Sequence, residues 1–253
     1  MEEVHREHIA GIEVRFYGEV TSTQDVVRAL AGRPGGGEAL AVVARHQTCG
    51  RGRGVHRWLS SPGDDLLLSL LWRPPALPAA AQALLPLTTT LAVLRTLHRH
   101  HPTLRIKWPN DILAGGRKLA GLLIENTLRG DRLAHTLVGV GINLNETAFP
   151  AELPAAVSLR MLTGRTYDPA VLLEELLPVL LQELQRSRPE NFPAIKEEYE
   201  AWLYLIGEEA PFEGPGGRFS ARLAGIDAWG RLLLHHADGR RRAWSLDEIT
   251  LMR

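Results

Sequence analysis

Short runs of apolar and β-branched residues recur along the chain, at 13–18, 39–44, 65–72, 104–109, 118–126 and 135–145. Runs of this kind predict strands, and the polar turn between the last two predicts that they pair as a hairpin. Helical patterns are found at 23–31, 82–100, 168–187 and 190–205. Because strands and helices do not alternate strictly, the order favours an α+β fold, with a mixed or antiparallel sheet and flanking helices.

The C-terminal segment 214–253 has a different pattern, with short strand-like runs at close spacing. Its turns are marked by the sequences GPGG, DAWG and ADGR. This pattern predicts a small antiparallel barrel or sheet that joins the main body near Gly207. We therefore expect two domains of unequal size, residues 1–206 and 207–253.

Two prolines and an aspartate bear on the helix predicted at 168–187. Asp168 suits its N-cap, because the carboxylate can accept a hydrogen bond from a free backbone N–H, and Pro169 suits its first turn. Pro178 lies inside the same pattern. Since proline removes a backbone hydrogen bond, it predicts a kink or a break there.

Composition excludes several classes of function. The chain has 29 lysines and arginines against 29 aspartates and glutamates, so any anion site must be local. The single cysteine, Cys49, excludes an intramolecular disulfide and a multi-cysteine metal site. Residues 74–94 carry no charge, but their four prolines favour a loop that enters a buried helix over a membrane span. We expect a cytoplasmic protein.

The segment QTCGRGRGVHRW, residues 47–58, alternates glycine with arginine. Glycine lets backbone N–H groups approach a ligand closely, and arginine offers a planar fork of donors, so the alternation can wrap an anion. No G-x-x-x-x-G-K-[ST] pattern occurs, so the segment is not a Walker A loop. Taken alone, it also fits a solvated hairpin tip or an Arg-Gly segment that binds RNA.

A second candidate segment is RIKWPNDILAGGRKLAGLLIEN, residues 105–126. Lys107 ends a strand-like run, Asn110 and Asp111 form a turn, and Lys118 enters the next strand. Turn chemistry explains the proline, asparagine, aspartate and glycines, but it does not require two flanking lysines.

A third segment, VGVGINLN at 138–145, alternates glycine with β-branched residues. Gly139 and Gly141 weaken a strand, so they mark either the close approach of a ligand or backbone, or a bulged edge strand. Asn143 and Asn145 would point to the same face.

Together these segments resemble the biotin protein ligases, enzymes that attach biotin to a lysine of a carboxylase carrier domain. The resemblance covers nearly the whole chain and rests on TSTQD (21–25), QTCGRGRGVHRW, KWPND, RKLAGLLIE, VGVGIN and the GID-x-x-G-x-L pattern at 225–232. It implies a catalytic domain on the main sheet. It also implies a small SH3-like C-terminal barrel that helps with ATP or carrier docking.

The resemblance assigns the biotin head group, a cyclic urea, to Ser22, Thr23 and Gln47. Ser22 also suits the N-cap of helix 23–31, and the two roles can coexist. Trp58 either stacks near adenine or is a plain core tryptophan. Further residues implied at the biotin and adenylate site are Gly50, Arg51, Gly52, Arg53, Gly121, Gly141 and Asn143.

The same resemblance implies the catalytic groups. Lys118 is expected where the biotin carboxylate meets the α-phosphate of ATP, to neutralise charge as pyrophosphate is displaced. Arg51 and Lys107 are expected to assist. Asn110 and Asp111 are candidates for organising the Mg²⁺ that ATP brings.

Two reaction steps are implied. The biotin carboxylate attacks the α-phosphorus of ATP, giving biotinyl-5′-adenylate and pyrophosphate, and a carrier lysine then attacks the adenylate and releases AMP. No covalent enzyme intermediate is needed, so Cys49 need not be a nucleophile. The glycine–arginine loop is expected to open for the ligand and to become ordered once the adenylate forms.

The chain departs from the family pattern at two points. Relatives often continue the loop as GRGR-x-G-R, whereas Gly54, Val55 and His56 follow here, which bears on loop closure. Twenty residues precede TSTQD, too few for the DNA-binding helix-turn-helix of some bacterial relatives, so no DNA partner is expected. Several relatives dimerise through the main sheet, which makes a homodimer a further expectation.

Three other functions are alternatives to a biotin ligase. A lipoate or octanoate ligase would share the architecture but accept a plain acyl chain. A non-enzymatic biotin- or nucleotide-binding regulator would not need Lys118 and both arginines. An Arg-Gly RNA-binding module is disfavoured by the zero net charge and by the lack of an aromatic platform.

Overall fold

The computed structural model describes residues 2–32, 37–54 and 56–252. Its main element is an eight-stranded sheet with the order β1-β2-β3-β6-β10-β9-β8-β7. These strands are β1 Glu3–Ile9, β2 Ile12–Val20, β3 Ala39–Gln47, β6 Asp65–Trp72, β7 Leu104–Lys107, β8 Asp111–Ala114, β9 Arg117–Arg129 and β10 Arg132–Asn143. β2 and β3 pair in parallel, and the other neighbouring pairs in this sheet are antiparallel. The predicted α+β class with a mixed sheet is confirmed.

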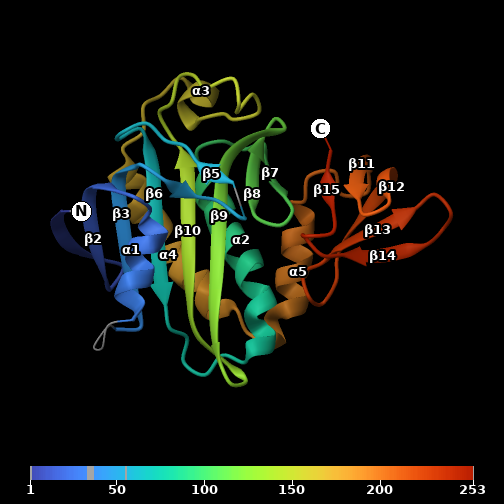
Figure 1. Ribbon diagram of the computed structural model, residues 1–253, viewed down its shortest axis with the longest axis horizontal. Helices are drawn as coiled ribbons and strands as arrows, with labels where there is room; N and C mark the ends of the chain where they lie inside the picture. Colours follow the sequence, from blue (N-terminus) through green and yellow to red (C-terminus); the bar gives the residue numbers. More distant parts are fainter. Residues whose placement is uncertain (1, 33–36, 55, 253) are drawn as a thin grey trace.

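Helices cover both faces of this sheet (Figure 1). Helix α1 (Thr23–Ala31) lies on one face, and α2 (Leu84–His98) and α4 (Pro169–Arg186) lie on the other. Strand β3 shows why both faces of the sheet are covered. Leu40 and Val42 pack with the apolar side of α1, and Ala41 and Val43 join the core on the opposite face. Alternate residues of a strand point to opposite faces, so a strand covered on both sides reads as a continuous apolar run.

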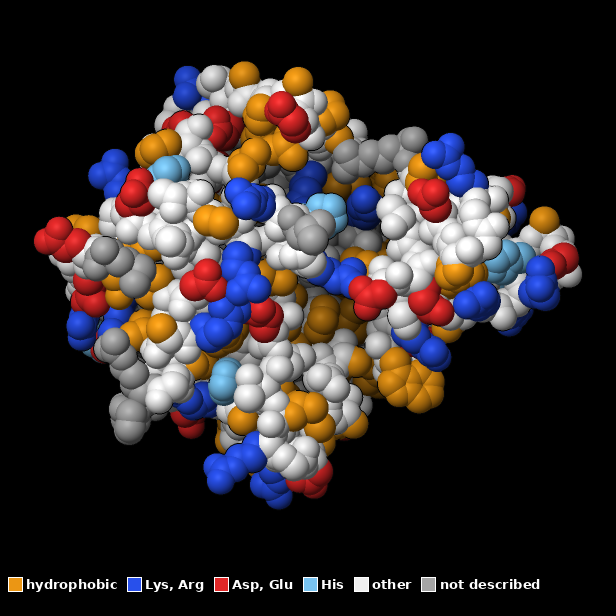
Figure 2. Space-filling view, viewed as in Figure 1, with side chains coloured by type: hydrophobic (Ala, Val, Ile, Leu, Met, Phe, Trp, Pro, Cys, Tyr) orange, Lys and Arg blue, Asp and Glu red, His pale blue; other side chains and the backbone are white. Residues whose placement is uncertain are grey.

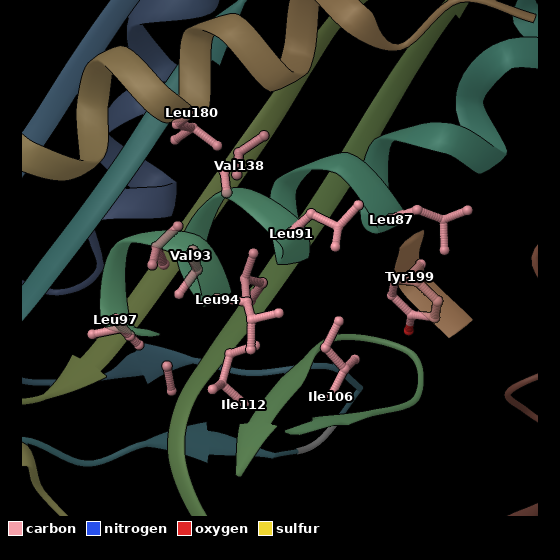
Figure 3. Packing of buried hydrophobic residues seen from close by; sticks show 14 of the residues in the cluster. Leu87, Leu91, Val93, Leu94, Leu97, Ile106, Ile112, Val138, Leu180 and Tyr199 are labelled. Carbon is pink, nitrogen blue, oxygen red and sulfur yellow. The ribbon is translucent and has the colours of Figure 1, made fainter. Parts of the chain in front are cut away.

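The centre of the main core is helix α2 (Figure 3). Its leucines pack against strands β7, β8 and β10 and against α4 and α5 (Phe192–Ala201), in a cluster that includes Leu91, Leu94, Ile106, Val138 and Tyr199. The segment Ala79–His98 is long and apolar enough to span a membrane, but 72% of its most apolar window is buried inside the protein. It begins with the 3₁₀ turn Ala79–Ala83, as expected for a loop that enters a buried helix.

Helix α4 follows the predicted capping. The Asp168 side chain accepts from Ala170 N at 2.9 Å, with Pro169 in the first turn. The helix runs unbroken through Pro178, so the predicted break does not occur. Pro178 lies on the exposed side of α4, where water can reach the carbonyl left without an N–H partner.

The C-terminal segment forms a second, five-stranded antiparallel sheet, as predicted, with the order β14-β13-β12-β11-β15 (Figure 1). Its strands are β11 Glu209–Gly214, β12 Gly217–Ile226, β13 Leu232–His236, β14 Arg241–Trp244 and β15 Thr250–Leu251. Its buried residues belong to the same continuous core as the main body, and Ile226 N donates to Glu200 of α5 at 2.6 Å. The boundary between 206 and 207 stays a prediction.

Candidate active site

A cavity of about 660 Å³ lies between the main sheet and the C-terminal sheet. Figure 2 shows the surface hollowed there, with charged side chains around the rim. The cavity brings together most of the predicted site residues, namely Ser22, Thr23, Gln47, Arg51, Gly52, Arg53, Trp58, Lys107, Asn110, Asp111, Lys118, Gly121 and Gly141. Gly50 and Asn143 are not among the residues that line it.

Neutral hydrogen-bonding groups stand where β2 turns into α1. Ser22 is the N-cap of α1 and accepts from Gln24 N at 3.2 Å, so its capping role is confirmed and it lines the cavity as well. The Gln47 Oε1 atom accepts from Thr23 N at 2.8 Å and lies 3.1 Å from the Thr23 hydroxyl. Ser22 and Thr23 are almost fully buried. Because buried polar groups need partners, a ligand that meets them must supply matching ones.

Two buried polar residues that sequence reasoning missed extend this group. Ser69 lies in the middle of β6 and Gln24 in the first turn of α1, and both line the cavity. Ser69 Oγ donates to Gln24 Oε1 at 2.9 Å and lies 2.8 Å from Thr23 Oγ1. A signal for Ser69 was available, since it is the one uncharged polar residue of the run DLLLSLLW, and a polar residue in a buried strand requires a partner.

The described part of the glycine–arginine segment forms a small hairpin. β4 (Gly50–Arg51) pairs with β5 (Arg57–Trp58), and Gly52 N donates to His56 O at 2.9 Å. The segment thus includes a hairpin, as one of the alternatives from the sequence had it, but most of its described residues also line the cavity and do not form a purely solvated tip. Val55, part of the departure from the family pattern, lies outside the described residues. The predicted ordering of this segment over an adenylate stays a prediction.

Ion pairs hold this hairpin on two sides. Arg51 donates to Asp25 of α1 at 2.9 Å, and its other terminal nitrogen lies 3.8 Å from Glu125 of β9. Arg53 pairs with Asp247, which belongs to the C-terminal part of the chain. Both arginines line the cavity, so their positive charges stand at its edge.

Glycines explain how Trp58 lies in the cavity. A Cβ at Gly141 would come within 2.5 Å of the Trp58 indole, and one at Gly121 would come within 3.1 Å of it. A Cβ at Gly50 would lie 2.5 Å from the Trp58 carbonyl oxygen. The alternation of glycine in VGVGIN therefore reflects close approach of another part of the chain. Trp58 belongs to the cavity wall and is half-buried, which is not the plain core position. Stacking on adenine stays a prediction.

Lys118 is held at both its backbone and its side chain. Its N–H donates to Ala155 O at 2.6 Å, and its carbonyl accepts from Val157 N at 2.9 Å. Asn143 Nδ2 donates to the same carbonyl at 3.3 Å, so Asn143 positions Lys118 from behind the cavity wall. The Lys118 ammonium lies 2.7 Å from Asp111 Oδ1. A cation fixed this way can stabilise charge that develops on a bound substrate.

The KWPND turn is anchored from several directions. Asn110 Nδ2 donates to Leu122 O of β9, and Trp108 Nε1 donates to Gly230 O at 2.9 Å. Tyr199 Oη donates to Pro109 O at 2.6 Å. Burial holds the pKa of Tyr199 well above its ordinary value, so it stays a neutral phenol that can donate. The hydrogen bond from Trp108 to Gly230 also shows that the GID-x-x-G-x-L motif at 225–232 contacts the KWPND turn directly.

Metal ligands are sparse. No group of three or more His, Cys, Asp or Glu residues that could hold a metal ion occurs in the part of the chain that the structure describes. Asp111 is the nearest carboxylate to Lys118 in the cavity wall, and it is engaged by that lysine. A divalent cation here would take most of its ligands from elsewhere, as Mg²⁺ does when it arrives with phosphate and water.

The fold and the cavity define a site that can hold a neutral polar head group and an anion side by side. Residues 17–143 match the biotin/lipoate A/B protein ligase family. The chain belongs to this family.

Individual relatives agree with this assignment. The bifunctional ligase/repressor BirA of Bacillus spizizenii is 32% identical over 243 residues, which are 94% of this chain and 74% of that protein. The biotin–[acetyl-CoA-carboxylase] ligase of Mycobacterium tuberculosis is 33% identical over 225 residues, 85% of this chain and 80% of that protein. Among solved structures, the biotin protein ligase from Aquifex aeolicus in complex with biotin and ATP superposes with a TM-score of 0.78 at 29% identity, covering 95% of this chain and 98% of the other.

Proposed function

We propose that this chain is an ATP-dependent biotin protein ligase. It activates biotin as biotinyl-5′-adenylate and transfers the biotinyl group to a lysine of a biotin carboxyl carrier domain, as in acetyl-CoA carboxylase. One observation carries the proposal. A single cavity presents the hydrogen-bonding groups of Ser22, Thr23 and Gln47 together with the cations of Lys118 and Arg53. This pairing fits a polar urea that is linked through a short chain to a carboxylate.

In the first half-reaction the biotin carboxylate attacks the α-phosphorus of ATP, and the bond to the pyrophosphate leaving group breaks. Negative charge accumulates on the phosphoryl oxygens, and the Lys118 ammonium neutralises it. Asp111 holds that ammonium before the substrate arrives, at 2.7 Å. Lys107, Arg51 and Arg53 supply further positive charge along the cavity edge. The residues act by positioning and electrostatics, and none forms a covalent bond with the substrate.

In the second half-reaction the neutral amine of the carrier lysine attacks the carbonyl carbon of the mixed anhydride, and AMP leaves with the bonding electron pair. The anhydride must be shielded from water between the two steps. We assign this role to the β4–β5 hairpin, since Arg51, Arg53 and Trp58 border the cavity. Its ion pairs with Asp25 and Asp247 are partly exposed, so a bound ligand can replace them.

We assign Mg²⁺ to ATP. Asp111 would contribute one oxygen ligand to a metal ion that arrives with ATP, and the metal would supply further positive charge toward the phosphates. A cytoplasmic location and a homodimer remain predictions from the sequence.

The rival within the family is a lipoate or octanoate ligase. A plain acyl chain would leave the polar groups of Ser22, Thr23 and Gln47 without ligand partners, and unpaired polar groups in a binding site weaken binding. The second rival is a binding protein without activity. It does not account for Lys118, whose backbone is fixed by three hydrogen bonds, to Ala155, Val157 and Asn143.

The test is ATP–pyrophosphate exchange by the purified protein with Mg²⁺, comparing biotin, lipoate and octanoate. We expect exchange with biotin alone. Exchange with lipoate or octanoate instead would move the chain to the acyl ligases. Tight biotin binding without exchange would favour the regulator.

A further inference from the structure

In the cavity wall, a row of buried hydrogen bonds leads from Thr23 to the carboxylate of Glu125. Thr23 Oγ1 lies 2.8 Å from Ser69 Oγ, and Ser69 Oγ donates to Gln24 Oε1 at 2.9 Å. The amide nitrogen of Gln24 donates to Glu125 Oε2 at 2.8 Å and lies 3.5 Å from Leu137 O. Gln24 is 2% exposed and Ser69 is fully buried, so water does not offer either of them another partner.

The direction of every proton in this row is determined. The carboxylate of Glu125 and the carbonyl of Leu137 can only accept hydrogen bonds, so the NH₂ end of Gln24 must face them. The Gln24 oxygen, which can only accept, therefore faces Ser69, and the Ser69 hydroxyl must donate its one proton to it. Ser69 Oγ can then only accept from Thr23.

Thr23 is left with a fixed polarity toward the cavity. Its hydroxyl proton has two acceptors within reach, Ser69 Oγ at 2.8 Å and Gln47 Oε1 at 3.1 Å. Ser69 is the nearer acceptor, and Gln47 Oε1 already accepts from Thr23 N, so the proton goes to Ser69. The Thr23 oxygen therefore offers a lone pair, and no proton, to a ligand. Ser22 and Gln47 have the opposite polarity, since Ser22 Oγ accepts from Gln24 N and Gln47 Oε1 accepts from Thr23 N. Their remaining O–H and NH₂ groups can donate.

We propose that Gln24, acting through Ser69, is a positioning residue that sets the ligand specificity of this site. It holds Thr23 as an acceptor, so that the site takes a head group with an N–H at that point and rejects one with an oxygen there. The inference rests on the proposed function, in which the head group is a cyclic urea with N–H groups beside a carbonyl.

The experiment compares biotin with the two cyclic carbamates in which a ring oxygen replaces one or the other urea N–H. Dissociation constants are measured by calorimetry for the wild-type chain, Gln24→Met, Ser69→Ala and the double variant. The wild-type protein should reject one carbamate by about 100-fold or more, because two acceptors would face each other.

Gln24→Met should have a dissociation constant for biotin within about threefold of that of wild type. Its ratio of dissociation constants, rejected carbamate over biotin, should fall by at least about tenfold. Without the Gln24 oxygen, Ser69 is free to donate to Thr23. The Thr23 proton can then turn to the carbamate oxygen, since Gln47 Oε1, its other acceptor, keeps the hydrogen bond from Thr23 N. Ser69→Ala should relax the rejection by a similar factor, and the double variant should add little, because both changes act through the same proton. Ser69→Ala also provides the test if Gln24→Met does not fold.

The matched control is Arg28→Met, which removes an ion pair with Glu125 but no bond between Gln24, Ser69 and Thr23. The ratio of its dissociation constants for the rejected carbamate and for biotin should equal that of wild type. A merely structural role for Gln24 would weaken both ligands equally and leave the ratio unchanged, which would overturn the inference. Wild-type binding of biotin and both carbamates with equal affinity would also overturn it. No biotin binding by the wild-type chain would overturn the proposed function and this inference together.

Discussion

At the residue scale, Lys118 combines a fixed position with limited stabilising value. Its ammonium pairs with Asp111 at 2.7 Å, but both side chains keep access to solvent, at 35% and 24% exposure. An ion pair of this kind contributes at most about 1 kcal/mol to folding. Its placement in the cavity therefore reflects chemistry more than stability.

We expect Lys118→Ala to keep the fold and to lose biotin-dependent ATP–pyrophosphate exchange by about 100-fold or more, because the developing phosphoryl charge loses its counterion. Exchange rates and thermal unfolding would be measured together. Arg117→Ala, a change at the exposed neighbouring position, is the control and should keep its exchange rate. Normal exchange by Lys118→Ala would refute the assigned role.

A second residue-scale feature is Asp65, which is 2% exposed at the start of β6. Its Oδ1 accepts from Leu144 N at 3.0 Å, while its Oδ2 is buried without a partner among the described residues. Burial raises the pKa of Asp65 to about 8. The carboxyl group is thus neutral in the folded protein at a pH where the unfolded chain carries its charge.

The sign of the pH dependence follows from that shift. The folded pKa lies above the unfolded value of 3.8, so the folded chain binds one more proton between pH 4 and 8, and the free energy of unfolding falls across this window. We expect Asp65→Asn to raise the free energy of unfolding by at least about 2 kcal/mol at pH 8.5, with a smaller gain at pH 5. Urea denaturation at both pH values measures this. A gain that does not grow with pH would contradict the assignment.

At the element scale, most predicted strands and helices are present, because their periodicity is local. The helix predicted at 23–31 is α1, and the run at 65–72 is β6 with the same ends. Strands β1 and β8 were not predicted. β1 carries the charged sequence EVHREHI at the edge of the sheet, and β8 is four residues long. Both are recognised as strands through pairing with a neighbour, which periodicity does not report.

Strands β9 and β10 leave room for the Trp58 indole because each carries a glycine where the ring lies against the sheet. Gly141 pairs with Gly121 across these strands, and both face the indole ring. The cavity wall at this point is therefore built from a glycine pair on the sheet and a ring from the β4–β5 hairpin.

We expect Gly141→Ala to displace Trp58, because the new methyl group would come within 2.5 Å of the indole. Biotin affinity should fall about tenfold or more, and the free energy of unfolding should fall by about 1–3 kcal/mol. Calorimetry, urea denaturation and tryptophan fluorescence would show the change. Gly216→Ala is the control, since a Cβ there meets no atom within 4 Å. Unchanged fluorescence and affinity in Gly141→Ala would show that Trp58 does not lie against the strand.

At the scale of the whole molecule, the two sheets share one core. Phe212 and Leu223 of the C-terminal sheet belong to the same buried cluster as Tyr199 and Leu203. Glu200 ties the two parts together, because it accepts from Ile226 N at 2.6 Å and from Lys196 at the same distance.

We therefore expect the chain to unfold in one cooperative transition, with equal calorimetric and van't Hoff enthalpies. Differential scanning calorimetry measures both. Glu200→Ala should lower the free energy of unfolding by about 1–3 kcal/mol, because it leaves the buried N–H of Ile226 unpaired. Two separate transitions in the wild-type chain would show instead that residues 207–253 unfold independently.

The sequence by itself determined the fold class, the cap of helix α4 and the C-terminal sheet, and most of the site residues it predicted line the cavity. These follow from local periodicity, turn residues and short motifs, all of which are legible along the chain. Asn143 shows the limit of this reasoning. The motif placed it in the site, whereas its amide holds the backbone of Lys118 from outside the cavity lining.

The tertiary structure alone decided which groups meet. Gln24 and Ser69 are 45 positions apart, and Gln24 and Glu125 are 101 apart, yet they form one hydrogen-bonded row. Arg53 likewise meets Asp247 across 194 positions. The reason is physical. A hydrogen bond between side chains depends on strand order and register, and these are set by burial of the whole sheet and not by residues adjacent in sequence.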